Sequence, residues 1–164
     1  MEVDFLFQIG DNIVYPMHGA GVIEAIEEKE ILGEKQRYYV INMPIGKLQI
    51  MVQMGKELNV GLRLAVDILT LESALLVFHN EESNPSLPWN QRYRINMDKM
   101  RTGDLQEGAE VVRDLKRRNN VKVLNTSEKR MLDNAWGILI SELVLVKECT
   151  EKQASDFLNQ QVNR

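Results

Sequence analysis

Apolar and polar residues alternate with a period of two in the first third of the chain. The clearest case is residues 48–53, where Leu48, Ile50 and Val52 face one side and the residues between them face the other. Three more runs rich in β-branched and aromatic residues lie between glycine- and proline-containing turns, over residues 5–16, 21–32 and 38–41. This pattern predicts a small, strongly curved antiparallel sheet or barrel over residues 1–65.

After about residue 65 the apolar positions recur every three to four residues, which is the period of an amphipathic helix. The change places a domain boundary near residues 61–66 and predicts an all-helical domain of about five helices over residues 66–164. The expected helices cover 67–80, the stretch from Trp89 to Gly103, two stretches that begin after Asp104 and Asn125, and 151–161, with a polar loop at 81–85. The fold class is therefore α+β, with the β module first.

Two of the expected helices begin with a capping pattern. Asp104 is followed three residues later by Glu107, and Asn125 is followed three residues later by Glu128. Lys129 and Arg130 would then fall in the first turn of the helix after Asn125. Because the helix dipole disfavours cations at that end, a site that collects phosphates there would explain both residues.

The formal net charge is −4, but the distribution of charge along the chain is uneven. Residues 88–130 hold 11 basic and 6 acidic residues, a net charge of +5, whereas the flanking segments are acidic. Such a local basic zone is typical of a nucleic-acid contact. Arg113, Lys116, Arg117 and Arg118 cluster at the end of one helix, where the dipole favours cations, so a solvated helix end explains that cluster equally well.

A tryptophan lies inside the basic zone, in the sequence Pro-Trp-Asn-Gln-Arg-Tyr-Arg of residues 88–94. Pro88 fits only the first turn of a helix, so Trp89 is expected at an exposed helix start with Arg92 and Arg94 beside it. Arginines can bind phosphates while a flat ring wedges against a base step from the minor groove. A core tryptophan is the alternative, although Trp136 suits a core position better.

Several other functions are disfavoured by the sequence. No apolar run is long enough to span a membrane, and the acidic residues 1–5 do not resemble a signal peptide. The single cysteine, Cys149, excludes an internal disulfide and agrees with a cytoplasmic location. His18 and His79 lie in no metal-binding motif, so no metal or other cofactor is expected. Cys149 and His79 also lack the supporting groups of a nucleophile and base, which argues against an enzyme with a small-molecule substrate.

Four segments of this sequence together resemble the bacterial CarD family (CarD/CdnL) of transcription regulators that bind RNA polymerase. These segments are residues 14–21 (VYPMHGAG), 89–94 (WNQRYR), 109–115 (AEVVRDL) and 127–132 (SEKRML). They occur in the same order and with similar spacing over nearly the whole chain. Four motifs in series are far more specific than any one of them.

The resemblance implies a fold and a set of contacts. The first domain would be a Tudor-like or SH3-like barrel that docks on the β subunit of RNA polymerase, with Lys29 and Met51 at contact positions. Met51 stands where the compared family members carry a basic residue. The helical domain would contact promoter DNA at the upstream edge of the transcription bubble, with Trp89 as a wedge in the minor groove. The basic residues expected to contact DNA are Arg92, Arg94, Arg118, Lys129 and Arg130.

The resemblance also implies a regulator that needs neither catalysis nor a cofactor, and that stabilises the open promoter complex. A stand-alone DNA-binding repressor is the alternative function. It would need a tight helix pair with base-reading side chains on one exposed face, and the sequence offers no such pattern.

Overall fold

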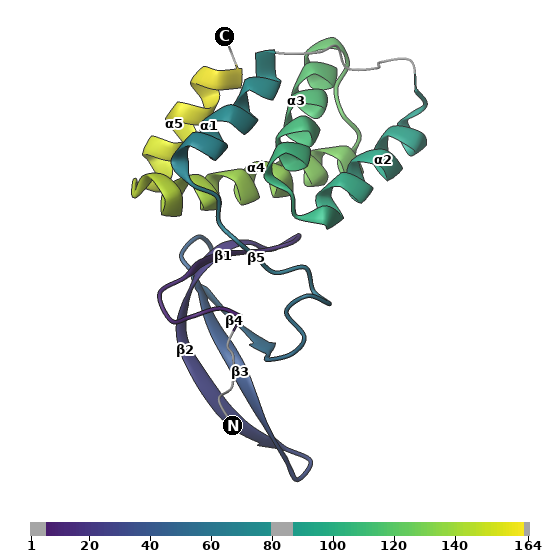
Figure 1. The fold of residues 1–164 in the computed structure, drawn as a ribbon. Coiled ribbons are helices and arrows are strands. Elements are labelled where there is room, and N and C mark those ends of the chain that lie inside the picture. The colour runs from purple at the N-terminus through teal and green to yellow at the C-terminus, as the bar shows by residue number, and fades with distance from the viewer. Residues whose placement is uncertain (1–5, 80–86, 163–164) are drawn as a thin grey trace.

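The computed structural model describes residues 6–79 and 87–162. Within those ranges a sheet comes first and helices follow it (Figure 1). The strands are β1 (Asn12–Tyr15), β2 (Gly19–Ile31), β3 (Glu34–Met43), β4 (Leu48–Gln53) and β5 (Arg63–Leu64). The helices are α1 (Ile68–Leu75), the 3₁₀ helix η1 (Leu76–His79), α2 (Trp89–Thr102), α3 (Leu105–Val121), α4 (Thr126–Lys147) and α5 (Glu151–Val162). The predicted α+β fold class is confirmed. The expected loop at 81–85 lies outside the described residues.

The sheet is antiparallel, with the strand order β4-β3-β2-β1-β5. β4 has the bounds that its alternating pattern predicts, and Val52 is buried in the core of the sheet. The sequence pattern missed β5, a strand of two residues in which Leu64 pairs with Ile13 and Arg63 with Val14 of β1. So short a strand has no periodicity of its own, and its pairing with β1 is what defines it.

β2 and β3 form a hairpin that is longer than the sequence pattern predicted. The predicted third strand began at residue 38 because residues 34–37 are polar, yet these residues pair with β2, and Glu30 lies opposite Lys35. Opposite charges on facing positions stabilise such a ribbon without apolar packing. Leu32 and Gly33 connect the strands with φ values of 53° and 81°, the left-handed conformation that a two-residue hairpin turn requires.

The predicted helix over residues 67–80 is divided into α1 and η1. α1 begins where Asp67 caps it, since its carboxylate accepts a hydrogen bond from the Thr70 N–H at 2.7 Å. Hydrogen bonding from the Thr70 side chain, together with this backbone bond, holds the pKa of the Asp67 carboxyl below its ordinary value. The tighter η1 turn follows from Leu76 onward and buries Val77 and Phe78 against the helical core.

The buried apolar residues form two separate clusters. One lies on the sheet and is centred on Ile13, Ile23, Tyr39 and Ile41. The other lies among the helices, and the stripe predicted along α4 is part of it through Leu132, Ala135, Leu139 and Leu143. The two periodicities in the sequence thus correspond to two cores.

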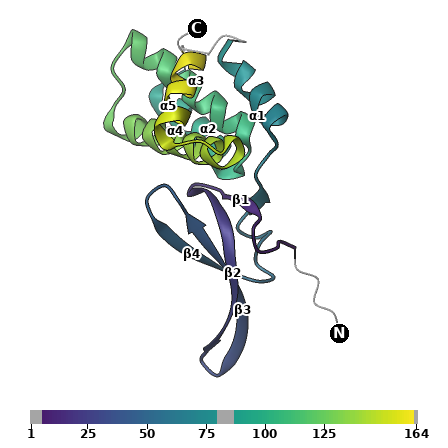
Figure 2. The same cartoon turned by 90° about the vertical axis from the view of Figure 1, so that its left-hand side faces the viewer.

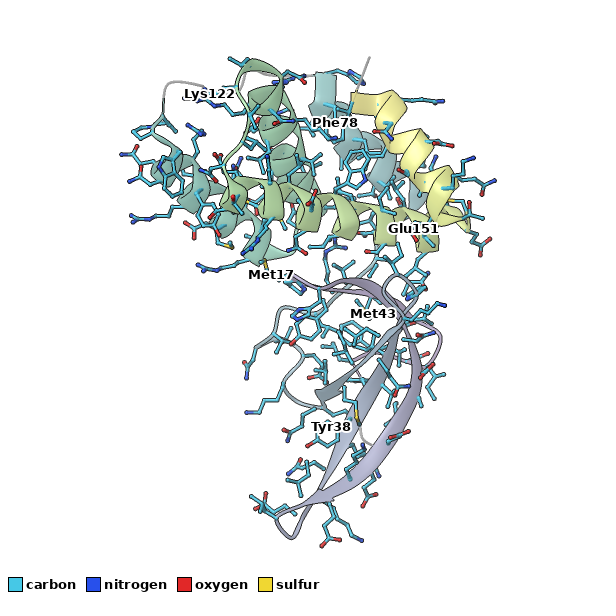
Figure 3. The ribbon with its side chains drawn as sticks, turned by 180° about the vertical axis from the view of Figure 1, so that it is seen from behind. Met17, Tyr38, Met43, Phe78, Lys122 and Glu151 are labelled. Atoms are coloured by element: carbon cyan, nitrogen blue, oxygen red, sulfur yellow. The ribbon has the colours of Figure 1, made fainter. Side chains whose placement is uncertain are left out.

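α4 joins the two parts because it lies across one end of the sheet, and most of the helical domain lies on its far side (Figures 1 and 2). The Ala20 N–H donates to Ser141 Oγ at 2.8 Å, and a Cβ added to the neighbouring Gly19 would lie only 2.9 Å from the same oxygen. A glycine is therefore needed there for close approach. Figure 3 shows Met17 at this junction, where its side chain packs against the helical core.

Candidate nucleic-acid interface

Trp89 is the first residue of α2, as Pro88 predicted. Pro88 occupies the N-cap position without a side-chain hydrogen bond to the helix. The tryptophan is 52% exposed, and its ring and that of Tyr93 pack edge to face, with 6.4 Å between the ring centroids. Trp136, in contrast, is partly buried against the helical core, with the Lys116 ammonium 4.6 Å from its ring centroid. Trp136 therefore contributes to the core, and Trp89 lies largely outside it.

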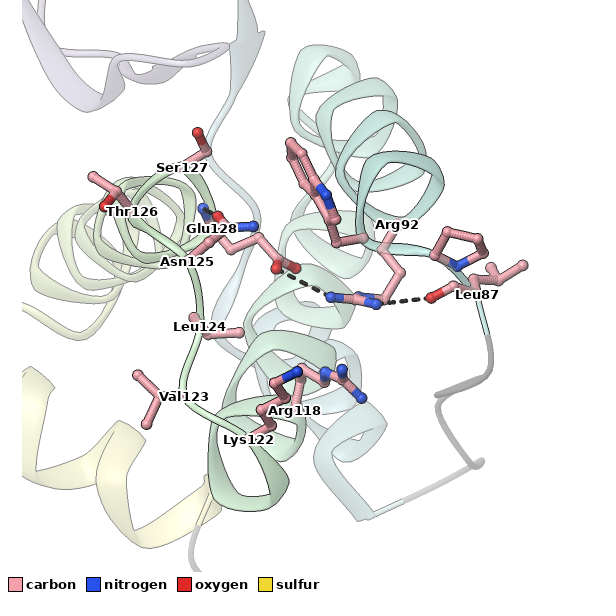
Figure 4. Close-up of a pocket in the computed structure, with 12 residues that line it drawn as sticks. Leu87, Arg92, Arg118, Lys122, Val123, Leu124, Asn125, Thr126, Ser127 and Glu128 are labelled. Carbon is pink, nitrogen blue, oxygen red and sulfur yellow. Dashed lines mark hydrogen bonds and ion pairs between the residues drawn. The ribbon is translucent and has the colours of Figure 1, made fainter.

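Trp89 lines an open pocket of about 790 Å³ between the starts of α2 and α4 and the end of α3 (Figure 4). Arg92 and Arg118 also line it, so the structure brings three of the predicted site residues together. The start of α4, residues 125–128, forms one wall. Lys122, which the sequence interpretation did not single out, adds another basic side chain. In the sequence, Lys122 could have been identified as a candidate because it lies in the basic zone 88–130.

The remaining predicted DNA contacts lie on α2 and α4, the two helices whose starts border this pocket. Lys129 is exposed directly after the lining residue Glu128, and Arg94 is exposed on α2. Arg130 lines a second, smaller hollow with Tyr93 and Met97, and Ser127 borders both hollows. Within the described residues, Arg94, Arg118, Lys122, Lys129 and Arg130 form no salt bridge. Their charges are therefore available for phosphates.

Arg92 differs from the other basic residues because its guanidinium is engaged within the protein. Its Nη2 lies 3.1 Å from Oε1 of Glu128, and its Nη1 donates to the Leu87 carbonyl oxygen at 2.7 Å. The side chain is only 14% exposed. The predicted DNA contact of Arg92 stays a prediction, and the geometry gives this residue a partner on α4 instead.

The capping pattern at Asn125 explains why Glu128 is in reach of Arg92. Asn125 Oδ1 accepts a hydrogen bond from the Glu128 N–H at 2.8 Å, so the predicted N-cap is present. A complete capping box would direct the glutamate side chain back to the cap residue. The Glu128 carboxylate points instead toward α2, where it is 2% exposed and binds Arg92.

The basic cluster at the end of α3 is a solvated helix end only in part. Arg113 is buried, with Nε 2.8 Å from Asp114 Oδ1 and Nη1 donating to the Val77 carbonyl at 3.3 Å. Arg117 donates to the Phe78 carbonyl at 3.3 Å. These two residues bind carbonyl groups of η1, so they hold η1 against α3, and Arg118 is the member of the cluster that lines the pocket.

The two residues predicted to contact polymerase lie on one face of the sheet. Lys29 pairs with Gln36 and Met51 pairs with Val40, and these partners on β3 are an even number of residues apart. Because side chains alternate along a strand and facing residues share a side, Lys29 and Met51 lie on the same face. The core residue Tyr39 occupies the opposite face. Met51 is on β4, an edge strand of the sheet.

No group of three or more metal-ligating side chains is found within the described residues, and no described helix is long and apolar enough to cross a bilayer. Because Trp89, Arg118 and Lys122 line it, the pocket offers a basic and aromatic surface that suits a polyanion with flat bases.

Comparison with known proteins places this chain in a family. The model of the family described as CarD, C-terminal domain, matches residues 73–159, and the model described as CarD-like/TRCF RID domain matches residues 7–60. The Bacillus subtilis (strain 168) protein named "Putative transcription factor YdeB" is 59% identical over 152 residues, which cover 93% of this chain and 99% of that protein. The chain therefore belongs to the CarD family, as its four motifs indicated.

A solved structure was also found, the solution NMR structure of the 72-residue N-terminal domain of Myxococcus xanthus CarD. It is 30% identical in sequence, and the match covers 38% of this chain and 84% of that domain with a TM-score of 0.32.

Proposed function

We propose that this CarD-family protein regulates the start of transcription in the bacterial cytoplasm by binding two partners at once. Residues 1–65 bind the β subunit of RNA polymerase, and residues 66–164 contact promoter DNA at the upstream edge of the transcription bubble. The match of residues 7–60 to a CarD-like/TRCF RID domain supports the first contact. The half-exposed Trp89 beside a basic pocket carries the second.

The mechanism is a shift of a conformational equilibrium. Polymerase and promoter exchange between closed and open complexes, and a factor that binds the unwound edge better than the annealed duplex favours the open complex by its differential affinity. Trp89 wedges into the distorted minor groove and opposes closure of the bubble. Arg94, Arg118, Lys129 and Arg130 bind the neighbouring phosphates. No reaction is catalysed and no cofactor takes part.

Because the protein is also bound to polymerase, a weak contact with DNA is sufficient to stabilise the open complex. A chain of net charge −4 has little general attraction for DNA. Once the β module is bound to polymerase, the helical domain is held next to the promoter, and its effective concentration there rises to the millimolar range, roughly, for a short connection. Lys29 and Met51 contribute to this docking from their common face of the sheet.

The experiment that tests the proposal compares Trp89→Ala with Ile95→Ala, since Ile95 is another exposed apolar residue of α2. Trp89→Ala should shorten the lifetime of the open complex by on the order of tenfold, equivalent to about 1.4 kcal/mol. Ile95→Ala should leave the lifetime unchanged. Both variants should melt within a few degrees of the parent and bind core polymerase normally. An unchanged lifetime with Trp89→Ala, or a large loss of its melting temperature, would contradict the wedge.

A further inference from the structure

The Gln91 and Arg92 N–H groups donate to the Pro88 carbonyl and fix the backbone of the first turn of α2, but these bonds do not connect that turn to α4. Pro88 provides no side-chain hydrogen bond to the first turn of α2, and the contact of the Trp89 ring with Tyr93 is an edge contact within the same helix. The guanidinium of Arg92 supplies the missing connection, because it binds the carbonyl of Leu87 just before the helix and the carboxylate of Glu128 on α4 (Figure 4).

Burial separates this pair from an ordinary surface ion pair. The side chains of Arg92 and Glu128 are 14% and 2% exposed, and within the described residues neither Arg92 Nε nor Glu128 Oε2 has a hydrogen-bond partner. A buried ion pair with unused hydrogen-bonding atoms gives poor net stability, because desolvation of the charges offsets their attraction. A role that such a pair can serve instead is to fix the position of the two elements that it joins.

We propose that Arg92 and Glu128 are positioning residues for Trp89, acting as a clamp that fixes the first turn of α2 against the start of α4. This inference rests on the proposed function of Trp89 as a wedge, and it assigns to Arg92 a role other than phosphate contact. The clamp holds the indole in one orientation beside the basic pocket, so that less conformational entropy is lost when DNA binds.

Removal of the Glu128 charge should change the open-complex lifetime in opposite directions for a clamp and for a purely electrostatic role. Glu128 is an acid near the expected path of DNA, so its removal should strengthen DNA binding if only charge matters. If Glu128 positions Trp89, its removal should weaken open-complex stabilisation instead. We expect Glu128→Ala to shorten the open-complex lifetime by on the order of tenfold. The matched control is Asp133→Ala, which removes an exposed acid from the same helix and should not shorten the lifetime.

The fluorescence of Trp89 can also be used to measure the mobility of this side chain in the free protein. The chain has two tryptophans, so a Trp136→Phe background leaves Trp89 as the single tryptophan, which can be excited selectively at wavelengths that tyrosine does not absorb. Arg92→Met in this background should lower the nanosecond anisotropy of Trp89 and increase its quenching by acrylamide. Arg94→Met, which removes an equal charge from an exposed position on the same helix, should leave both quantities unchanged. Equal behaviour of Arg92→Met and Arg94→Met would overturn the clamp.

A double variant covers the case in which a single variant fails to fold. Arg92→Met alone leaves Glu128 buried without its partner, whereas Arg92→Met combined with Glu128→Leu removes both charges. The folded double variant should still show a mobile Trp89, and an unchanged anisotropy there would also overturn the clamp. Because the fluorescence is measured without DNA or polymerase, a loosened Trp89 supports the clamp even if Trp89→Ala shows that the wedge is wrong.

Discussion

The guanidinium of Arg63 and the carboxylate of Glu142 form a two-bond ion pair across the junction of sheet and helices, with N–O distances of 2.7 and 2.9 Å. Glu142 is completely buried on α4, and its second oxygen also accepts the Val66 N–H at 3.0 Å. Arg63 Nε donates to the Gly103 carbonyl at 2.7 Å. One side chain of the β module thus binds both α4 and the end of α2, the helix that carries Trp89.

The first prediction concerns this ion pair. Arg63→Met leaves Glu142 buried without its cation and should lower the free energy of unfolding by about 3 to 5 kcal/mol. Urea denaturation measures this loss. The double variant Arg63→Met with Glu142→Leu should recover part of the stability, because no uncompensated charge remains. A single variant within about 0.5 kcal/mol of the parent would show that the pair does not hold the junction.

The second prediction concerns Gly103, the residue that ends α2. Its φ is 71°, and a Cβ added there would lie 2.6 Å from Pro16 Cγ of the β module. Gly103→Ala should cost about 2 kcal/mol or more, because left-handed strain and a clash at the junction add together. Gly33→Ala is the control. Gly33 has a φ of 81° and nothing within 4 Å of the added Cβ, so strain alone should cost it about 1 kcal/mol. Equal losses of melting temperature would show that the Pro16 contact is unimportant.

The third prediction concerns the basic side chains around the pocket. Neutralising Arg118 and Lys129 together should weaken DNA binding to a similar degree for all sequences and reduce the log-log salt slope by roughly one to two units. Titrations of DNA at several salt concentrations measure the slope. Lys35 and Lys152, exposed on β3 and α5, provide a control pair whose neutralisation should leave the slope unchanged. If the two double variants behave alike, net charge rather than a defined contact governs binding.

The fourth prediction concerns pH and Tyr39, which is buried in the core of the sheet. Burial raises the pKa of its hydroxyl above the ordinary value of 10.0. The neutral form is therefore favoured in the folded state, and ionisation in the unfolded state begins at a lower pH. The corresponding stability is present below pH of about 10 and is lost as the pH rises through the folded-state pKa.

Tyr39→Phe tests this assignment because it removes the ionisable hydroxyl. Denaturation between pH of about 9 and 11 should show a steeper loss of stability for the parent than for the variant. The variant also loses the hydrogen bond from the Phe7 N–H to the hydroxyl, so its stability at neutral pH should be somewhat lower. Parallel curves at alkaline pH would contradict the assignment to Tyr39.

The sequence by itself determined the elements that depend on local periodicity and local capping. The alternation of residues 48–53 gave the bounds of β4, and the caps at Asp104 and Asn125 are present, each accepting a hydrogen bond from the N–H three residues later. Pro88 placed Trp89 at the exposed start of its helix. Each of these features depends on residues that are close together in the sequence, so the spacing of residue types is enough to predict it.

Only the tertiary structure decided which distant side chains meet. Arg92 and Glu128 are 36 residues apart, and Arg63 and Glu142 are 79 residues apart, so no periodicity relates the members of either pair. β5 is a strand because it pairs with β1. Arg113 is buried because η1 packs onto α3. The crossing of helices and the pairing of strands bring these groups together, and once they are buried their charges and carbonyls must find partners within the protein rather than in water.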